Sequence, residues 1–143
     1  MLLLSGCDGG ERLHVYFVDD WTGRLVRVDT VAREPRALLR ELTTPVDGLV
    51  SELPRSAELD SFLVRDRVAY VALRGPRPAH PREFHLSAQI VYTLTEHPGI
   101  DAVVLTLNGR RCCVYTNTSP SRPWPKPLDR KLFAGWSGAP ENG

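Results

Sequence analysis

One stretch of the sequence decides the fold: Leu86-Ser87-Ala88-Gln89-Ile90-Val91-Tyr92-Thr93-Leu94-Thr95-Glu96-His97-Pro98-Gly99-Ile100. Its apolar residues recur at i, i+4 and i+8, as Leu86, Ile90 and Leu94, which is the spacing of one buried helix face. Pro98-Gly99 then ends the pattern, because proline and glycine favour the end of a helix. The sequence therefore predicts a helix from Glu83 to His97.

Strands are predicted on both sides of this helix. Asn108-Gly109 favours a tight two-residue turn between a strand at 102–107 and a return strand at 110–115. Upstream, alternating apolar and β-branched residues predict four more strands, at 13–18, 24–29, 59–64 and 68–73. Pro35 and Pro45 bound a short helix at 35–43. The resulting ββαββαββ order predicts an α+β fold, a mostly antiparallel sheet with two helices packed on one face.

Composition limits the classes of function. The chain has 143 residues, of which 42% are hydrophobic, and a formal charge of +1 from 18 basic and 17 acidic residues. Its size fits one domain, and its near-neutral charge gives no field to attract nucleic acid, so we expect no nucleic-acid partner. The 3 cysteines are too few for a disulfide scaffold or a four-thiolate zinc site, and we expect no cofactor.

Residues 1–12 are predicted to form a membrane anchor and tether. Leu4-Ser5-Gly6-Cys7 resembles the lipobox of bacterial lipoproteins, in which the cysteine is acylated and holds the protein to the outer face of a membrane. The following Asp8-Gly9-Gly10-Glu11 suits a flexible tether. Only Leu2, Leu3 and Leu4 form the apolar stretch, whereas a secretory signal needs about 7 to 15 such residues. We therefore expect either an initiation codon upstream or a trimmed start, with a chance match to the lipobox as the alternative.

The domain proper is expected at 13–115, and a proline-rich tail at 116–143. Near the end of the tail, an apolar stripe is formed by Leu128, Leu132, Phe133 and Trp136. Two interpretations stay open. The stripe folds back onto the domain, or it remains free as a contact for a partner or a membrane surface.

A family resemblance rests on Gln89, Val91, Tyr92, Thr93, Leu94, Pro98 and Gly99, followed by Val103 and the Asn108-Gly109 turn. These residues resemble the signature of the GerMN domain, which occurs in bacterial sporulation and spore-germination proteins and in envelope lipoproteins. The resemblance covers about residues 13–109. It implies a compact domain of helices and strands in an extracytoplasmic position, which agrees with the anchor expected at Cys7. The chain departs from the family near Arg67, where relatives usually have glycine, and at Tyr70-Val71-Ala72-Leu73, where they usually have an acidic residue.

The chemically reactive side chains form no catalytic pattern. Cys112 and Cys113 are adjacent on a predicted strand, so their side chains are expected on opposite faces, which disfavours a disulfide. No motif supports a nucleophilic pair between either thiol and His97. His80 and His85 have no carboxylate or thiolate ligands beside them, so we expect no metal site.

The sequence leaves three functional hypotheses. The first is a non-catalytic, lipid-anchored envelope module that binds another protein or assembles with itself, through a sheet edge or through the tail stripe. The alternative is an accessory domain that binds a cell-wall fragment or a small metabolite through Tyr16 and Trp21. A third, weaker hypothesis is a hydrolase that uses Cys112 or Cys113.

Overall fold

The computed structural model describes residues 12–79 and 82–140, so Cys7 and the lipobox lie outside the described residues. The strands form two sheets. The first has the order β2-β1-β3 and contains β1 (Leu13–Asp19), β2 (Leu25–Thr30) and β3 (Leu49–Val50). The second has the order β4-β5-β6-β7 and contains β4 (Glu58–Arg65), β5 (Val68–Arg74), β6 (Ala102–Leu107) and β7 (Arg110–Arg111).

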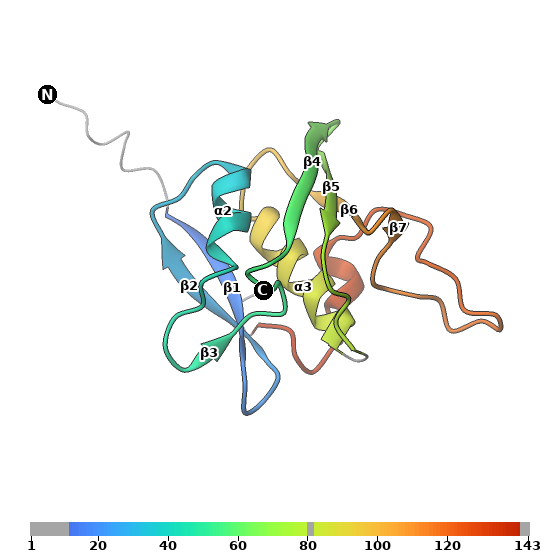
Figure 1. Cartoon of the computed structure of the whole chain (residues 1–143), viewed down its shortest axis with the longest axis horizontal. Helices are drawn as coiled ribbons and strands as arrows, with labels where there is room; N and C mark the ends of the chain where they lie inside the picture. Colours follow the sequence, from blue (N-terminus) through green and yellow to red (C-terminus); the bar gives the residue numbers. More distant parts are fainter. Residues whose placement is uncertain (1–11, 80–81, 141–143) are drawn as a thin grey trace, which may run out of the picture.

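The central element is α3 (Arg82–Leu94), which lies between the two sheets (Figure 1). It contacts β1, β6, α2 (Pro35–Glu41) and the 3₁₀ turn η1 (Arg130–Phe133). All residues from Leu86 to Leu94 are buried, polar ones included. A helix buried around its whole circumference holds both sheets in one hydrophobic core.

The predicted α+β fold is confirmed, with two refinements to the sheet. The strands divide between two sheets, since β1 pairs with β2 and β3, while β4 to β7 pair among themselves. Within the second sheet β5 and β6 run parallel, while the other pairs are antiparallel. A parallel pair needs a long crossover connection, and α3 supplies it.

The predicted return strand at 110–115 is too long, because β7 ends at Arg111. The tail takes the place of its second half beside β6. Leu128 and Val103 exchange two backbone hydrogen bonds, 2.7 and 2.8 Å from nitrogen to oxygen. The chain after Cys112 is therefore displaced from the β6 edge by a segment that comes later in the sequence.

The predicted helix at 83–97 also ends early, since α3 stops at Leu94. Thr95 donates from Oγ1 to the carbonyl of Val91 at 2.7 Å, and the next two amides bond three residues back instead of four. This tightening is common where a threonine hydroxyl takes a helical carbonyl. After this tightened turn, the Glu96 carboxylate lies against β1, where it accepts hydrogen bonds from His14 and Tyr16.

The β4–β5 turn explains the departure from the family near Arg67. Asp66 and Arg67 have φ angles of 52° and 66°, in the left-handed region that favours glycine. Arg67 is held there by two hydrogen bonds to the carboxylate of Asp101, 2.6 and 3.0 Å, and by one to the carbonyl of Pro98 at 2.8 Å. The contacts with Asp101 and Pro98 therefore hold an arginine in a backbone conformation for which the family usually has glycine.

Candidate functional site

The family signature begins with a buried amide that joins α3 to the loop after β3. Gln89 is fully buried, and its Oε1 accepts the backbone N–H of Glu52 at 2.9 Å. Its Nε2 donates to Oγ of Ser51 at 2.9 Å. Both ends of the amide are therefore satisfied, which gives this glutamine a structural role.

Thr93 and Tyr92 join α3 to β1. The Thr93 hydroxyl oxygen, fully buried, accepts the backbone N–H of Tyr16 at 3.0 Å, a donor in the middle of the strand. The Tyr92 ring lies 5.4 Å from the ring of Tyr16, measured between centroids. Val91 and Leu94, the remaining helical members of the signature, are buried in the core.

Pro98 and Gly99 form the turn that leads into β6. The carbonyl of Pro98 accepts from Arg67, and the N–H of Gly99 donates to Nδ1 of His97 at 3.0 Å. The signature residues therefore have structural roles: Gln89 joins α3 to the loop after β3, Thr93 joins it to β1, and Pro98 holds the turn before β6.

The densest polar cluster lies just after α3, around the carboxylate of Glu96. Oε1 lies 2.8 Å from Nδ1 of His14 and accepts the backbone N–H of the same residue at 3.1 Å. Oε2 accepts from the hydroxyl of Tyr16 and from Nη2 of Arg130, both at 2.9 Å. Residue spacing does not predict this cluster, because its members come from three separate segments.

The surroundings of this cluster shift the pKa of Tyr16 upward and the pKa of Glu96 downward. Burial raises the pKa of the Tyr16 hydroxyl to about 12, with Glu96 adding to the rise and Arg130 opposing it. Burial also favours a higher pKa for Glu96, but the hydrogen bonds from His14, Arg130 and Tyr16 outweigh it and lower that pKa below its usual value. Glu96 therefore favours the ionised form, with the His14 backbone N–H, the His14 ring, Tyr16 and Arg130 around its carboxylate.

The tail stripe packs onto the domain. Leu128 and Phe133 are buried, and Leu132 and Trp136 pack against the core as partly buried residues. Phe133 and Trp136 each place a ring 5.2 Å from the ring of Phe84 on α3. The folded-back arrangement is the one that the structure shows, so these four side chains do not form a free surface for a partner.

The two adjacent cysteines differ from expectation. Both are buried, but they lie beyond the end of β7, across a cis peptide bond. Their sulfur atoms lie together on one side of the chain, so the expected placement on opposite faces was wrong. The alternation of side chains holds only along a regular strand, and this strand has already ended.

The other chemical candidates do not converge. His80 lies outside the described residues, and His85 contacts the ring of Trp136 and the carbonyl of Gly23. Within 12–79 and 82–140, no three histidine, cysteine, aspartate or glutamate side chains are placed to hold a metal ion. Tyr16 is 1% exposed and Trp21 is 94% exposed on a turn, so the two aromatic residues proposed for ligand binding do not share a site.

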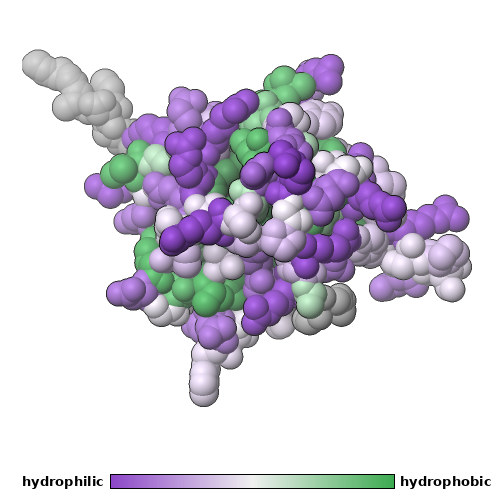
Figure 2. Space-filling model, viewed as in Figure 1, coloured by the Kyte–Doolittle hydropathy of each residue, from purple (hydrophilic) through white to green (hydrophobic). Residues whose placement is uncertain are grey.

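The clearest exposed apolar surface lies on the β4–β5 hairpin. Six large hydrophobic side chains are exposed in the described part of the chain, and three of them, Leu63, Val64 and Tyr70, are on this hairpin. Leu63 pairs directly with Tyr70 across the two strands, which puts both on the outer face of the sheet. Figure 2 shows hydrophobic residues at the end of the hairpin, next to hydrophilic ones.

The fold and the signature define a small domain that holds together around one buried helix, and the comparisons with known proteins identify it. The sequence model of the Germane family, described as sporulation and spore germination, matches residues 14–112. The chain belongs to this family, which confirms the resemblance seen in the signature. No curated protein sequence matches the chain.

Solved structures share the fold. The first GerMN domain of the sporulation protein GerM from Bacillus subtilis superposes with a TM-score of 0.66 at 19% identity, covering 85% of this chain and 98% of that one. The tandem GerMN domains of the same protein give 0.67 at 19% identity, covering 85% of this chain and 47% of that one. A predicted lipoprotein from Clostridium perfringens gives 0.53 at 19% identity, with 85% and 88% covered.

Proposed function

We propose that this protein is a non-catalytic, sporulation-related interaction domain of the cell envelope, held to the membrane by a lipid on Cys7, which binds another protein through the outer face of the β4–β5 hairpin. The family description and the C. perfringens relative support the sporulation and lipoprotein parts of this proposal. In the described residues, no helix has the length and hydropathy to cross a bilayer. A lipid is therefore the form of attachment that the lipobox favours.

The observation that carries the interaction role is the direct pairing of Leu63 with Tyr70, 51% and 38% exposed, on neighbouring strands. Apolar residues gathered in this way on one surface are typical of contacts with another protein. The guanidinium of Arg65 lies 5.8 Å from the centroid of the Tyr70 ring and borders the surface with charge.

The other end of the same hairpin is protected. A bulge interrupts the pairing between Leu59 and Ser61, and Arg74 forms ion pairs with Glu58 and Asp60 at 2.7 and 2.9 Å. Bulges and charges on an edge strand prevent indiscriminate pairing with other strands. The contact is therefore proposed to use the side chains at the Leu63 end, with the backbone edge of β4 playing a smaller part.

Site-specific crosslinking tests the surface. A photocrosslinking residue in place of Leu63 is expected to capture one defined partner, or a second copy of this chain, in intact cells. The same residue in place of Val31, which is 82% exposed on another part of the molecule, is the matched control. Tyr70→Asp in the Leu63 crosslinking protein should abolish the capture. A protein that stays a strict monomer and crosslinks equally from both positions would contradict the interaction role.

Metabolic labelling tests the anchor separately. With the full upstream gene present, a palmitate analogue is expected to label the wild-type protein and not Cys7→Ser. If neither protein is labelled, lipidation is refuted, while the interaction surface remains open to its own test.

The alternative function is an extracytoplasmic ligand-binding domain for a cell-wall fragment or a small metabolite. Tyr16 and Trp21 no longer support it, because one is buried and the other lies far out on a turn. Ligand binding is instead supported by a different part of the molecule, a cavity lined by Arg36, Arg40 and Arg55.

A further inference from the structure

A cavity of about 410 Å³ lies between α2 and the strands β4 and β5. Its floor is apolar and is formed by Leu39, Leu53, Ala57, Leu59 and Leu73. Leu39, Leu53 and Leu73 are each 5% exposed or less, so the floor is continuous with the core. The volume falls within the range of about 300 to 1,000 Å³ that is typical of small-molecule sites.

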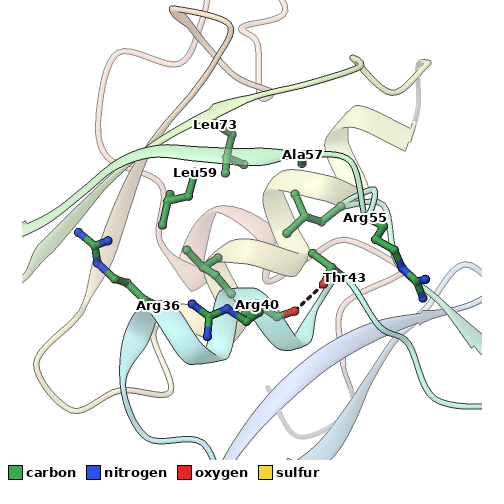
Figure 3. A pocket seen from close by; sticks show the side chains of 9 residues that line it. Arg36, Arg40, Thr43, Arg55, Ala57, Leu59 and Leu73 are labelled. Atoms are coloured by element: carbon green, nitrogen blue, oxygen red, sulfur yellow. Dashed lines mark hydrogen bonds between the residues drawn. The ribbon is translucent and has the colours of Figure 1, made fainter.

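Three arginines stand around this apolar floor. Arg36 and Arg40 are four residues apart on α2 and therefore share one side of the helix, while Arg55 comes from the loop before β4. Figure 3 shows Leu59 and Leu73 on one wall, and the arginines spaced along the opposite rim from Arg36 at one end to Arg55 at the other. No aspartate or glutamate is among the described residues that line the cavity.

Within the described residues, these three arginines form no ion pair with a carboxylate. Arg36 donates to the carbonyl of Phe62 at 3.4 Å and lies over the Phe62 ring. Arg40 and Arg55 have no ion pair or side-chain hydrogen bond with any residue in 12–79 or 82–140. By contrast, Arg67, Arg74, Arg77 and Arg130 all pair with carboxylates elsewhere in the molecule.

We propose that this cavity binds a small amphiphilic anion, a free molecule with an aliphatic body and one carboxylate or phosphate head group. The aliphatic body would lie on the leucine floor and lose its contact with water. Arg40 and Arg55 are exposed on the rim, and their guanidinium groups would turn inward to donate charge-assisted hydrogen bonds to the head group. They suit oxyanions because a guanidinium presents two parallel donors. This site is separate from the β4–β5 interaction surface and does not depend on the proposed function.

Calorimetric titration of the full 143-residue chain carrying Cys7→Ser tests the proposal. Octanoate and octyl phosphate are the probes, and octanol and inorganic phosphate each supply only half of the proposed chemistry. Both amphiphilic anions are expected to bind, and both half-probes at least about tenfold more weakly, the factor that corresponds to one charge-assisted hydrogen bond. Octanol or phosphate binding as tightly as the amphiphiles would overturn the proposal.

Variants locate the binding. Arg40→Gln and Arg55→Gln should each weaken octanoate binding roughly tenfold. Arg27→Gln, an exposed arginine of β2 outside the cavity, should leave it unchanged. Ala57→Leu keeps all three charges but fills the floor, and it should abolish binding. Equal losses in Arg27→Gln and Arg40→Gln, or full binding by Ala57→Leu, would contradict the site.

A lipid surface is the competing source of the same chemistry. Vesicles of phosphatidylglycerol distinguish it, because an acyl chain held in a bilayer cannot reach the leucine floor without leaving the membrane. Vesicle binding that requires Arg40 and Arg55, together with no binding of free octanoate, would overturn the proposal of a free ligand.

Discussion

Arg130 donates from Nη2 to Oε2 of Glu96 at 2.9 Å and thereby fastens the tail of the chain to the end of α3. The same guanidinium donates to Oγ1 of Thr95 and to the carbonyl of Tyr92, and its carbon lies 4.8 Å from the centroid of the Tyr92 ring. The tail is therefore part of the folded domain, held by a cation that reaches over one aromatic ring to a partly buried carboxylate.

Removing this cation should lower stability. Arg130→Gln leaves the Glu96 carboxylate without the arginine cation beside it, in surroundings where Glu96 is only 13% exposed. We expect a loss of about 2 kcal/mol in the free energy of unfolding, below the range for a fully buried pair. Urea denaturation measures it, with the neighbouring exposed residue changed in Lys131→Gln as the control. Equal stability of both variants would show that the contact is dispensable.

Acid should weaken the protein through Glu96. The pKa of this carboxyl is lowered in the folded state relative to its usual 4.5, so its contribution is present above pH 4.5 and is lost as the pH falls below it. The free energy of unfolding of the wild type is expected to fall more steeply on acidification than that of Glu96→Gln. Other carboxylates are common to both proteins, so the difference in slope isolates Glu96. Parallel curves would refute the assignment.

Alkali should weaken the protein through Tyr16. Its pKa is raised from 10.0 to about 12, so the unfolded chain loses this proton first. The stabilising contribution is therefore complete below pH 10 and is lost as the pH rises toward 12. Tyr16→Phe should flatten this part of the stability curve, measured by urea denaturation at each pH, while Tyr92 titrates in both proteins. A Tyr16→Phe curve as steep as that of the wild type would contradict the shift.

The family signature should report on folding. Gln89→Leu leaves the N–H of Glu52 without its acceptor and removes one of the two hydrogen bonds to Ser51 Oγ, the other coming from the N–H of Leu53. We expect a loss of about 1 to 3 kcal/mol, and a smaller loss in Ser51→Ala, because Ser51 is only half-buried and Gln89 keeps its hydrogen bond to Glu52. Thermal denaturation of both variants provides the comparison. A Gln89→Leu protein of full stability that fails to bind a partner would instead assign the signature to recognition.

The tail aromatic cluster offers a second test of where the domain ends. Phe133 is fully buried, with its ring 5.2 Å from that of Phe84. Phe133→Ala should cost about 3 to 5 kcal/mol, the range for an aromatic core residue. Lys131→Gln again serves as the exposed control in the same turn. A negligible cost would mean that the domain folds without its tail.

Local patterns predicted the elements of this fold well. Leu86, Ile90 and Leu94 lie on the buried helix because helix periodicity depends only on near neighbours. The Asn108-Gly109 turn was predicted correctly for the same reason, and both of its residues have positive φ. The errors of extent at the ends of α3 and β7 come from competing contacts made by Thr95 and Leu128, and the helix predicted at 35–43 also ends early, at Glu41.

The site could not be predicted in the same way. Glu96 and His14 are 82 residues apart, and nothing in the spacing of either segment indicates that they meet. The tail stripe had the right period for an apolar face, but periodicity does not say which surface that face covers. The arginine-lined cavity likewise arises only when α2 and the β4–β5 hairpin come together around Leu39 and Leu59.

The β1–β2 hairpin gives the molecule two poles. The described chain enters β1 at Leu13, and the far end of that seven-residue strand lies roughly 20 Å away. There the turn carries Trp21, and the tail returns to the same end, where the N–H of Leu25 donates to the carbonyl of Gly138 at 2.8 Å (Figure 1). In a protein tethered through Cys7, Leu13 marks the proximal pole. Trp21 and the end of the tail then form the opposite pole, a strand's length away from the attachment.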